Sequence, residues 1–451
     1  MMENNKIYGV FKRILCVVLA AGMVVSTSAC NSNAPSQKGT DKSGNSKIEI
    51  EYWYGLGGTL GKEMDNIIND FNASQNRITV KGVKQADYTE TSKLLQAAIA
   101  ANQPPAAVLM PPEYTNKFMK RKALQNLDGY IEKKSDFHKD DIIPALLNYG
   151  TGSDGHIYAL PAYSTTHILF YRKESFKKAG IDPDKALKSW QSLAEASKKL
   201  SVKKNGETVS YGWDPMYEPV HFIDIARAAG GQVLSKDQKT VTFDSPEWVE
   251  SWESMRKWIN QDHIMKFNFG GEGWEFWYKT MDDVLQGRTA GYTGSTADIS
   301  DLDFNIVDAH VQPGWKDKPA KPYIDAVMSS VLAAAPEQQK AAAFEWISYL
   351  SSTEENSKFS INTGYLPVRT SCREDKQFKA YVERVPAMGV AIDQTKIAIP
   401  LFVDITGGKV SQAIKDALDL VLIENVPAKE ALTREKKIAQ AALDEYWAAQ
   451  S

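Results

Sequence analysis

Residues 48–83 read IEIEYWYGLGGTLGKEMDNIINDFNASQNRITVKGV, and this stretch decides the fold class. Polar and apolar residues alternate at its start, which predicts a strand over residues 48–54. Apolar residues then recur at i, i+3, i+4 and i+7 (Met64, Ile67, Ile68 and Phe71), which predicts an amphipathic helix. A second strand is expected over residues 78–83 and a second helix over about residues 89–101. This order predicts an α/β fold with a parallel sheet and right-handed crossovers.

The loop between the first strand and the first helix, residues 55–61, reads GLGGTLG. Backbone amides at a helix N-terminus favour phosphate, but the spacing G-x-G-x-x-x-G departs from the dinucleotide-binding pattern. The second strand also runs into Lys84-Gln85-Ala86, without an acidic residue at its end to hold a ribose. We therefore expect no nucleotide cofactor, and we expect this loop to let another ligand approach the carboxyl end of the first strand.

The N-terminal segment is typical of an exported chain. Lys12 and Arg13 precede an apolar run over residues 14–25, which is too short to span a bilayer. Small residues then lead into Cys30, and this run resembles the bacterial lipobox, although Thr27 stands where leucine is usual. We expect a signal peptide over residues 1–29, followed by a lipidated Cys30 and a flexible polar tether over residues 30–47. The alternative is an ordinary signal peptide with an incidental cysteine.

Composition and charge exclude several classes of protein. Of the 451 residues, 43% are hydrophobic and 24% charged, as in an ordinary globular protein. A net charge of -3 gives no basis for nucleic-acid binding, which needs a concentrated basic surface. Cys16 leaves with the signal peptide and Cys30 takes the lipid, so Cys372 has no disulfide partner. The histidines show no metal-binding spacing, so no metal site is expected. The roughly 400 residues after the tether predict two lobes.

The middle of the chain predicts a crossover between those lobes. A turn at residues 152–155 leads into an extended segment and then into an apolar strand over residues 167–171. We expect a hinge near residues 160–166. Helices are expected over residues 173–179, 182–200, 337–350 and 410–423, with a further strand over residues 323–335.

Four segments carry a resemblance to a known family: residues 51–74, residues 157–200, LQGRTAGYTGS at residues 285–295, and FEWISYLSSTEENSKFSINTGYLPVR at residues 344–369. In order and spacing they resemble the extracellular solute-binding proteins of ABC importers, in particular the carbohydrate-binding group that includes maltose and glycerol-3-phosphate binders. The resemblance implies a two-lobe fold of the type II periplasmic-binding-protein kind, with a multi-strand hinge and a ligand cleft between the lobes. Lobe 1 is expected over residues 48–161 plus about 300–350, and lobe 2 over residues 162–299 plus about 351–451.

Aromatic residues in loops are candidates for ligand contact. A sugar offers hydroxyls and flat C–H faces, so its binder needs aromatic platforms beside short polar side chains. Aromatic residues pack in cores more often than they bind ligands, so placement in loops decides the choice. The aromatic candidates chosen in this way are Tyr54, Trp213, Tyr217 and Trp274. Trp213 lies in the loop YGWDP, where we expect a stacking face, whereas Trp248, Trp252 and Trp258 are expected to be packing or surface residues of a helix.

The resemblance to glycerol-phosphate binders implies further ligand contacts. A tyrosine, an acceptor carboxylate, two small hydroxyl residues and a late tyrosine correspond to Tyr88, Glu113, Thr165, Ser295 and Tyr365. The arginine that holds phosphate in that group has no counterpart in residues 399–406 (IPLFVDIT). Because phosphate loses its strongest contact without the guanidinium, a neutral saccharide is the favoured ligand.

The predicted function is therefore capture of a neutral mono- or oligosaccharide by a monomeric, lipid-anchored protein on the extracytoplasmic face of the cell membrane. The resemblance implies delivery to the permease subunits of an ABC transporter, without catalysis and without a cofactor. A glycerol-phosphate ligand is the main alternative. An exported glycosidase that uses two carboxylates and a structural surface lipoprotein are the others.

Overall fold

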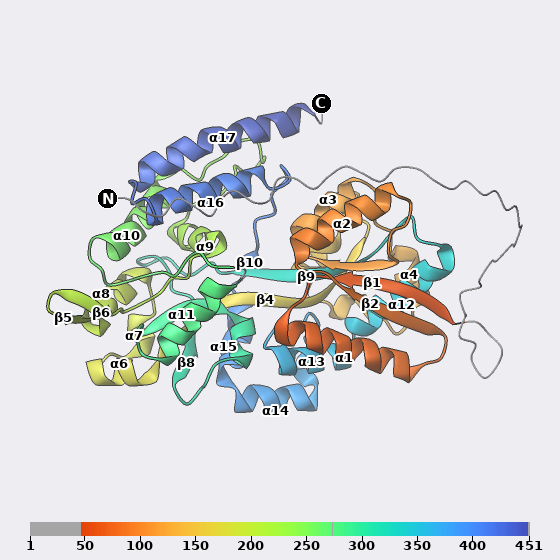
Figure 1. Ribbon diagram of the computed structural model, residues 1–451, viewed down its shortest axis with the longest axis horizontal. Helices are drawn as coiled ribbons and strands as arrows, with labels where there is room; N and C mark the ends of the chain where they lie inside the picture. Colours follow the sequence, from red (N-terminus) through yellow and green to blue (C-terminus); the bar gives the residue numbers. More distant parts are fainter. Residues whose placement is uncertain (1–46, 273, 450–451) are drawn as a thin grey trace, which may run out of the picture.

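The computed structural model describes residues 47–272 and 274–449, and one mixed sheet runs through its long axis (Figure 1). The eight strands follow the order β2-β1-β3-β9-β4-β7, with β10 beside β9 and β8 beside β4. They are β1 (Ile48–Tyr54), β2 (Ile78–Lys84), β3 (Ala107–Met110), β4 (Ala159–Arg172), β7 (Gly291–Ser295), β8 (Val307–His310), β9 (Tyr323–Val331) and β10 (Ile399–Pro400). A separate hairpin is formed by β5 (Val202–Lys204) and β6 (Glu207–Ser210).

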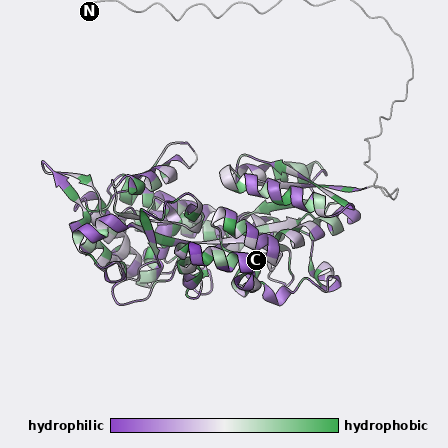
Figure 2. Cartoon of the chain, turned by 90° about the horizontal axis from the view of Figure 1, so that it is seen from below, coloured by the Kyte–Doolittle hydropathy of each residue, from purple (hydrophilic) through white to green (hydrophobic). Residues whose placement is uncertain are grey.

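Helices cover the sheet and build both ends of the molecule. The first half of the chain forms α1 (Gly58–Ser74), α2 (Tyr88–Ala100), α3 (Pro112–Lys120), α4 (Asp128–Lys133), α5 (Pro144–Leu147), α6 (Lys173–Ala179), α7 (Pro183–Ala186), α8 (Trp190–Leu200) and α9 (Pro219–Ala229). The second half forms α10 (Pro246–Asn260), α11 (Glu275–Leu285), α12 (Glu337–Leu350), α13 (Thr353–Thr363), α14 (Lys376–Arg384), α15 (Pro386–Gln394), α16 (Lys409–Leu422) and α17 (Ala428–Ala448). The predicted bounds of α6 and α12 are confirmed. Figure 2 shows hydrophobic and hydrophilic stretches alternating along the helices, as expected of helices with one buried face.

The opening β1-α1-β2 unit is confirmed, because β1 pairs in parallel with β2 and with β3. The side chains predicted to form the apolar face of α1 are all buried: Met64, Ile67, Ile68 and Phe71. The parallel pattern ends there, however. β9 is antiparallel to both β3 and β4, which corrects the expectation of a parallel sheet. The reason is topological, because β9 belongs to the chain as it returns from the far lobe.

β4 joins the two lobes. The predicted hinge near residues 160–166 and the predicted strand over residues 167–171 form one continuous strand. Its first half pairs with β9 as far as Thr166, and its second half, from His167, pairs with β7. Figure 1 shows β4 and β9 side by side where the chain passes between the lobes. The place where β4 changes partner is therefore the place where the two lobes meet.

Each lobe has its own apolar core. One core packs β1, α1 and α12 together and contains Tyr52, Phe71 and Trp346. Phe359 of α13 packs in this core, although the sequence assigned residues after about 350 to lobe 2. A second core packs α8, α9, α10, α16 and α17, and a third packs α11, α14 and α15 on the other face of β4. Trp248 and Trp252 lie fully buried in the second core, as expected of packing residues.

The predicted signal peptide and lipidated Cys30 lie outside the described residues, as does the tether up to residue 46. Within residues 47–272 and 274–449, no helix combines the length and the apolar character that crossing a membrane requires.

Candidate functional site

Polar side chains gather where β4 changes partner. Thr165 of β4 pairs with Asp325 of β9, and the Thr165 Oγ1 lies 2.9 Å from the hydroxyl of Ser295 at the end of β7. The hydroxyl of Thr296 lies 3.0 Å from the same Thr165 oxygen. The structure thus brings Thr165 and Ser295 together, two residues that the resemblance singled out.

Tyrosines from separate parts of the chain meet beside these hydroxyls. The hydroxyl of Tyr88, at the start of α2, lies 2.9 Å from that of Tyr163 in β4. The Tyr163 ring meets the Tyr365 ring edge-on, with centroids 4.8 Å apart. Burial raises the pKa of Tyr365, and the next contribution comes from Tyr88. Tyr88 and Tyr365 therefore lie near each other as neutral hydroxyl groups.

Glycine at position 55 is what allows Tyr88 this position. A Cβ on Gly55 would lie 2.3 Å from the backbone carbonyl of Asp87, the residue that caps α2. We expected the loop over residues 55–61 to let a ligand approach the end of β1. Gly55 instead makes room for the N-terminus of α2, because a larger residue would collide with it.

Two carboxyl groups face this region. Glu113 lies in the first turn of α3, and its side chain reaches solvent. Its pKa is raised, first by partial desolvation and then by the negative charge of Asp404. Asp325 is half-buried, and burial raises its pKa to about 7, with a further contribution from Glu113. The sequence analysis did not single out Asp325. The feature that could have revealed it is a lone acidic residue inside the apolar strand YIDAVMSSV. We define the junction site as Tyr88, Glu113, Thr165, Ser295, Asp325 and Tyr365.

Large aromatic side chains at the N-terminal end of α11 stay open to solvent. Trp274 is 61% exposed, Tyr278 58% and Phe269 53%, and we define these three as the aromatic platform. Burial is the main cause of the raised pKa of Tyr365, and Tyr278 is among the groups that add to it. The Trp274 ring meets the Trp277 ring with centroids 5.9 Å apart, and the Trp277 Nε1 donates at 2.8 Å to Asp298, in the turn that follows Ser295. These contacts bring the N-terminal end of α11 close to Ser295 of the junction site.

Three of the predicted aromatic contacts are placed differently. Trp213 is fully buried, and its Nε1 donates to the hydroxyl of Thr293 at 3.3 Å, so it offers no stacking face. Tyr54 is also buried and its hydroxyl donates to Asp65. Tyr217 is half-buried and donates to Asp419. These residues pack the lobes, which corrects the expectation for Trp213 and Tyr54.

A buried polar layer lies behind the junction site. The Nε2 atom of His167 lies 2.6 Å from the Tyr323 hydroxyl and 3.4 Å from the Nε2 of His221. Desolvation lowers the pKa of both histidines, that of His221 to about 4. Neither imidazole carries a positive charge at neutral pH, so this layer offers no cation to an anionic ligand.

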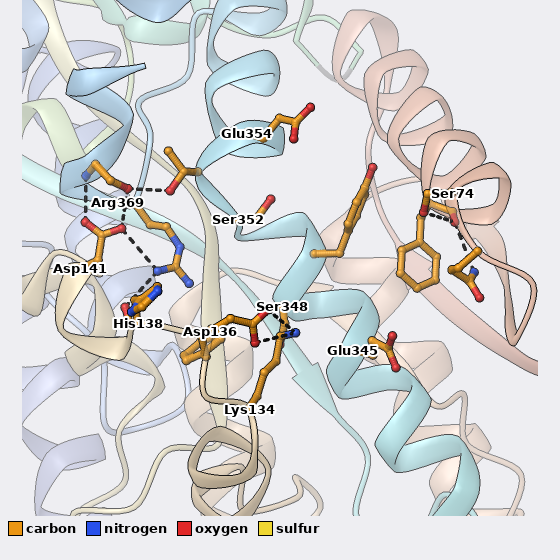
Figure 3. A pocket seen from close by; sticks show the side chains of 16 residues that line it. Ser74, Lys134, Asp136, His138, Asp141, Glu345, Ser348, Ser352, Glu354 and Arg369 are labelled. Carbon is orange, nitrogen blue, oxygen red and sulfur yellow. Dashed lines mark hydrogen bonds and ion pairs between the residues drawn. The ribbon is translucent and has the colours of Figure 1, made fainter. Parts of the chain in front are cut away.

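A pocket of about 860 Å³ opens elsewhere, between α1, α12 and the segment after α4 (Figure 3). Two ion pairs form within its lining, Arg369 with Asp141 at 3.4 Å and Lys134 with Asp136 at 3.2 Å, and Glu345 pairs with Arg77 outside it. Phe71, Phe137 and Tyr349 of its lining belong to or pack against the core of β1 and α12, and no lining residue comes from α8–α11. We therefore place the functional site at the junction and not in this pocket.

Comparisons with known proteins identify the fold. The sn-glycerol-3-phosphate-binding periplasmic protein UgpB of Yersinia pestis is 26% identical over 411 residues, which cover 88% of this chain and 90% of the relative. UgpB of Mycobacterium tuberculosis, solved with glycerophosphocholine, has a TM-score of 0.77 at 21% identity, and the match covers 88% and 98% of the two chains. Lmo0181 of Listeria monocytogenes, solved with cycloalternan, has a TM-score of 0.76 at 22% identity, with 88% and 99% covered.

These similarities confirm the predicted fold class, α/β with two lobes of the type II periplasmic-binding-protein kind. The family model described as bacterial extracellular solute-binding protein matches residues 66–387, which include both strands of the crossing and every residue of the junction site. Ser295 and Tyr365 lie in two of the segments whose sequence resembles this family. The chain therefore belongs to the family of bacterial extracellular solute-binding proteins.

Proposed function

We propose that this chain is the substrate-binding component of an ABC importer and holds a neutral mono- or oligosaccharide between its lobes. The observation that carries the proposal is the aromatic platform, three exposed rings, of which Trp274 contacts Trp277, whose Nε1 donates to Asp298 in the turn after Ser295 of the junction site. Aromatic rings stack on the C–H faces of a sugar, and hydroxyl and carboxyl groups bond its rim. Exposed apolar rings gathered in one place are typical of binding surfaces.

Charge supports a neutral ligand over a glycerol phosphate. Glu113 and Asp325 put two acidic groups in the junction site, and the histidines behind them are neutral. Arg227 is buried, beside Asp224, and donates to the carbonyl of Pro400 at 3.2 Å. A phosphate at the junction site would meet like charges without a free guanidinium. The likeness to UgpB keeps the glycerol-phosphate alternative in the test.

We propose that the protein binds its ligand without catalysis, and the names of its relatives, which describe them as binding proteins, support this. The contacts of the cores support two lobes joined by β4 and β9, and we retain as a proposal the lobe boundaries after residue 161 and near residues 300 and 350. Tyr54 and Tyr217 are left out of the proposed contacts, whereas Trp274 is kept. The proposed partners are the permease subunits, with the protein acting as a monomer.

Titration calorimetry on a panel of neutral saccharides, uronates and glycerol phosphates tests the proposal, with product analysis on the same samples. We expect saturable binding of a neutral sugar and unchanged sugar afterwards. Hydrolysis of the sugar would support the glycosidase. Tight binding of a glycerol phosphate, with no response to neutral sugars, would overturn the proposed ligand.

The lipid anchor is a separate proposal that rests on the sequence around Cys30. A Cys30→Ala variant should appear in the soluble fraction outside the cytoplasmic membrane, while the parent protein stays with the membrane. Equal membrane retention of both proteins would contradict the anchor.

A further inference from the structure

Asp325 is the one acid of the junction site that no prediction and no comparison assigned. Its Oδ1 accepts a hydrogen bond at 2.8 Å from the backbone N–H of Ala326. Its Oδ2 has no hydrogen-bond donor, and no ion pair reaches the side chain, among the residues that the structure describes. The side chain is half-buried, and Oδ2 is not among the fully buried oxygens that lack a partner, so this oxygen is open to a ligand.

Three of the hydroxyls near Asp325 have other hydrogen-bond partners. Asp325 contributes to the raised pKa of four tyrosines, after burial in each case: Tyr88, Tyr149, Tyr323 and Tyr365. The Tyr149 hydroxyl donates to the carbonyl of Ile324 at 2.7 Å. Tyr88 is bonded to Tyr163, and Tyr323 lies 2.6 Å from His167. The protein thus surrounds the Asp325 oxygen with polar groups that do not donate to it.

Neither a metal ion nor a fixed cation of the protein completes this site. In residues 47–272 and 274–449, no group of three or more histidine, cysteine, aspartate or glutamate side chains is placed to hold a metal. Arg227 contributes to the pKa of Tyr149, but Asp224 is the first of its charge partners. Glu113 adds a second negative charge. What completes the site must therefore arrive with the ligand.

We infer that Asp325 selects the ligand by charge: its free oxygen accepts from a donor group of the bound saccharide, favours a protonated amine over a hydroxyl at that position, and rejects phosphate and carboxylate. This inference rests on the proposed function and narrows it to amino sugars. A charge-assisted hydrogen bond is about twice as strong as a neutral one, and an ammonium also neutralises the repulsion between Asp325 and Glu113.

The first test needs no ligand. Desolvation raises the pKa of Asp325 to about 7, so folding favours its protonated form. The stability that this form contributes is full at low pH and is lost as pH rises toward 7. Asp325→Asn should therefore raise the melting temperature by a few degrees, about 2–4 °C, at pH 8 and change it little at pH 5. Asp308→Asn is the matched control, because Asp308 also lies in a strand and bonds the next backbone N–H at 2.8 Å.

The second test compares probes that differ in charge. Calorimetry would measure cellotriose against the glucosamine trisaccharide, which replaces each 2-hydroxyl with an ammonium, and glucose against glucuronate and glucose 6-phosphate. In the parent protein we expect the amine to bind about tenfold tighter than its neutral twin, and the anions to bind weakest. Asp325→Asn should bring amine and neutral probes within about threefold of each other and admit the anions, whereas Asp325→Glu should retain the parent ranking.

Each outcome bears on a different statement. Equal affinity of the parent for amine and neutral probes, or an equal loss for both probes in Asp325→Asn, would overturn the charge selection while sugar capture stands. If the Asp325→Asn variant is no more stable than its parent at pH 8, the statement that the Asp325 carboxylate lacks a compensating partner is wrong, whatever ligand binds. Failure of every saccharide would instead remove the proposed function, and the stability comparison would still decide the state of Asp325.

Discussion

Tyr365 lies near residues of both lobes. Its ring centroid is 4.8 Å from that of Tyr163. Its pKa is raised by burial first, then by Tyr88 and, more weakly, by Tyr278. Tyr365→Phe keeps the ring and removes one hydroxyl. If that hydroxyl bonds the sugar, binding should weaken by about 0.5–1.5 kcal/mol. Calorimetry with the best saccharide checks this.

Tyr130→Phe is the matched control for Tyr365→Phe, because the Tyr130 hydroxyl donates to Glu337 at 3.0 Å in an exposed place. The control should bind sugar as the parent does. An equal loss in both variants would show that Tyr365 acts through folding and not through contact.

Trp274 offers the largest exposed ring of the aromatic platform. Trp274→Ala should weaken saccharide binding by about 1–3 kcal/mol, on the scale of ring stacking against nucleic-acid bases. The melting temperature of the ligand-free protein should stay nearly constant, because an exposed side chain contributes little to folding. Affinity and melting temperature measured on one preparation separate the two effects, and unchanged affinity would remove Trp274 from the site.

Trp213, which the sequence led us to misjudge, and Asp325, which it led us to miss, show what local sequence patterns do not reveal. Trp213 lies in a loop rich in Gly and Pro, yet it is buried because Gly291 leaves space for its ring. That space is created by a residue far along the chain. Asp325 was readable in principle, since an acid interrupts an apolar strand, but only the pairing with β4 shows that it faces the junction.

At the scale of elements, the position of β7 depends on the close approach of its residue Gly291 to the Trp213 ring and to β4. A Cβ on Gly291 would lie 2.2 Å from the Trp213 ring and 2.8 Å from the carbonyl oxygen of Phe170. Gly291→Ala should therefore destabilise the protein by about 1–3 kcal/mol, as overpacking does. Denaturant unfolding measures the change.

Gly129 provides the contrasting substitution, since it sits in α4 and nothing lies within 4 Å of the place that an alanine methyl group would take. Gly129→Ala should stabilise the protein by about 0.4–1 kcal/mol, because alanine restricts the unfolded chain. If both alanine variants behave alike, crowding by Trp213 is not the cause of the Gly291 effect.

Local patterns predicted elements well where the chain buries one face. The i, i+3, i+4, i+7 spacing located α1, and Gly180, in the left-handed conformation at φ 65°, ends α6 where predicted. Strand direction was not predictable past β3, because β9 is separated from β3 by many elements of the far lobe, among them α8–α11. Pairing across such a distance leaves no local trace, so the mixed sheet needed the structure.

At the scale of the whole molecule, buried acids outnumber buried histidines. Five carboxyl groups have a pKa raised to about 7, and desolvation is the largest cause in each case: Asp214, Glu218, Asp224, Asp298 and Asp325. Their stabilising contribution is full below pH 4 and is lost as pH rises to about 7. The two histidines act in the opposite sense, since their contribution is full above pH 6.5 and is lost as pH falls toward 4.

The melting temperature of the ligand-free protein should therefore fall between pH 6.5 and pH 8, where the contribution of the histidines is close to complete. Calorimetric scans across that range test the sign. Asp224→Asn should flatten part of the fall, since one Asp224 oxygen is buried without a partner. A melting temperature that rises toward pH 8 would contradict the assignment of these acids.

Trp274 is also an optical reporter that the protein already carries. Six tryptophans are almost completely buried, Trp190, Trp213, Trp248, Trp252, Trp315 and Trp346, and they form a background that a quencher such as acrylamide reaches poorly. Collisional quenching will therefore report most strongly on Trp274, at 61% exposure. A sugar that covers this ring shields it, so the loss of quenching identifies ligands in crude mixtures, without a label and whatever the cargo is.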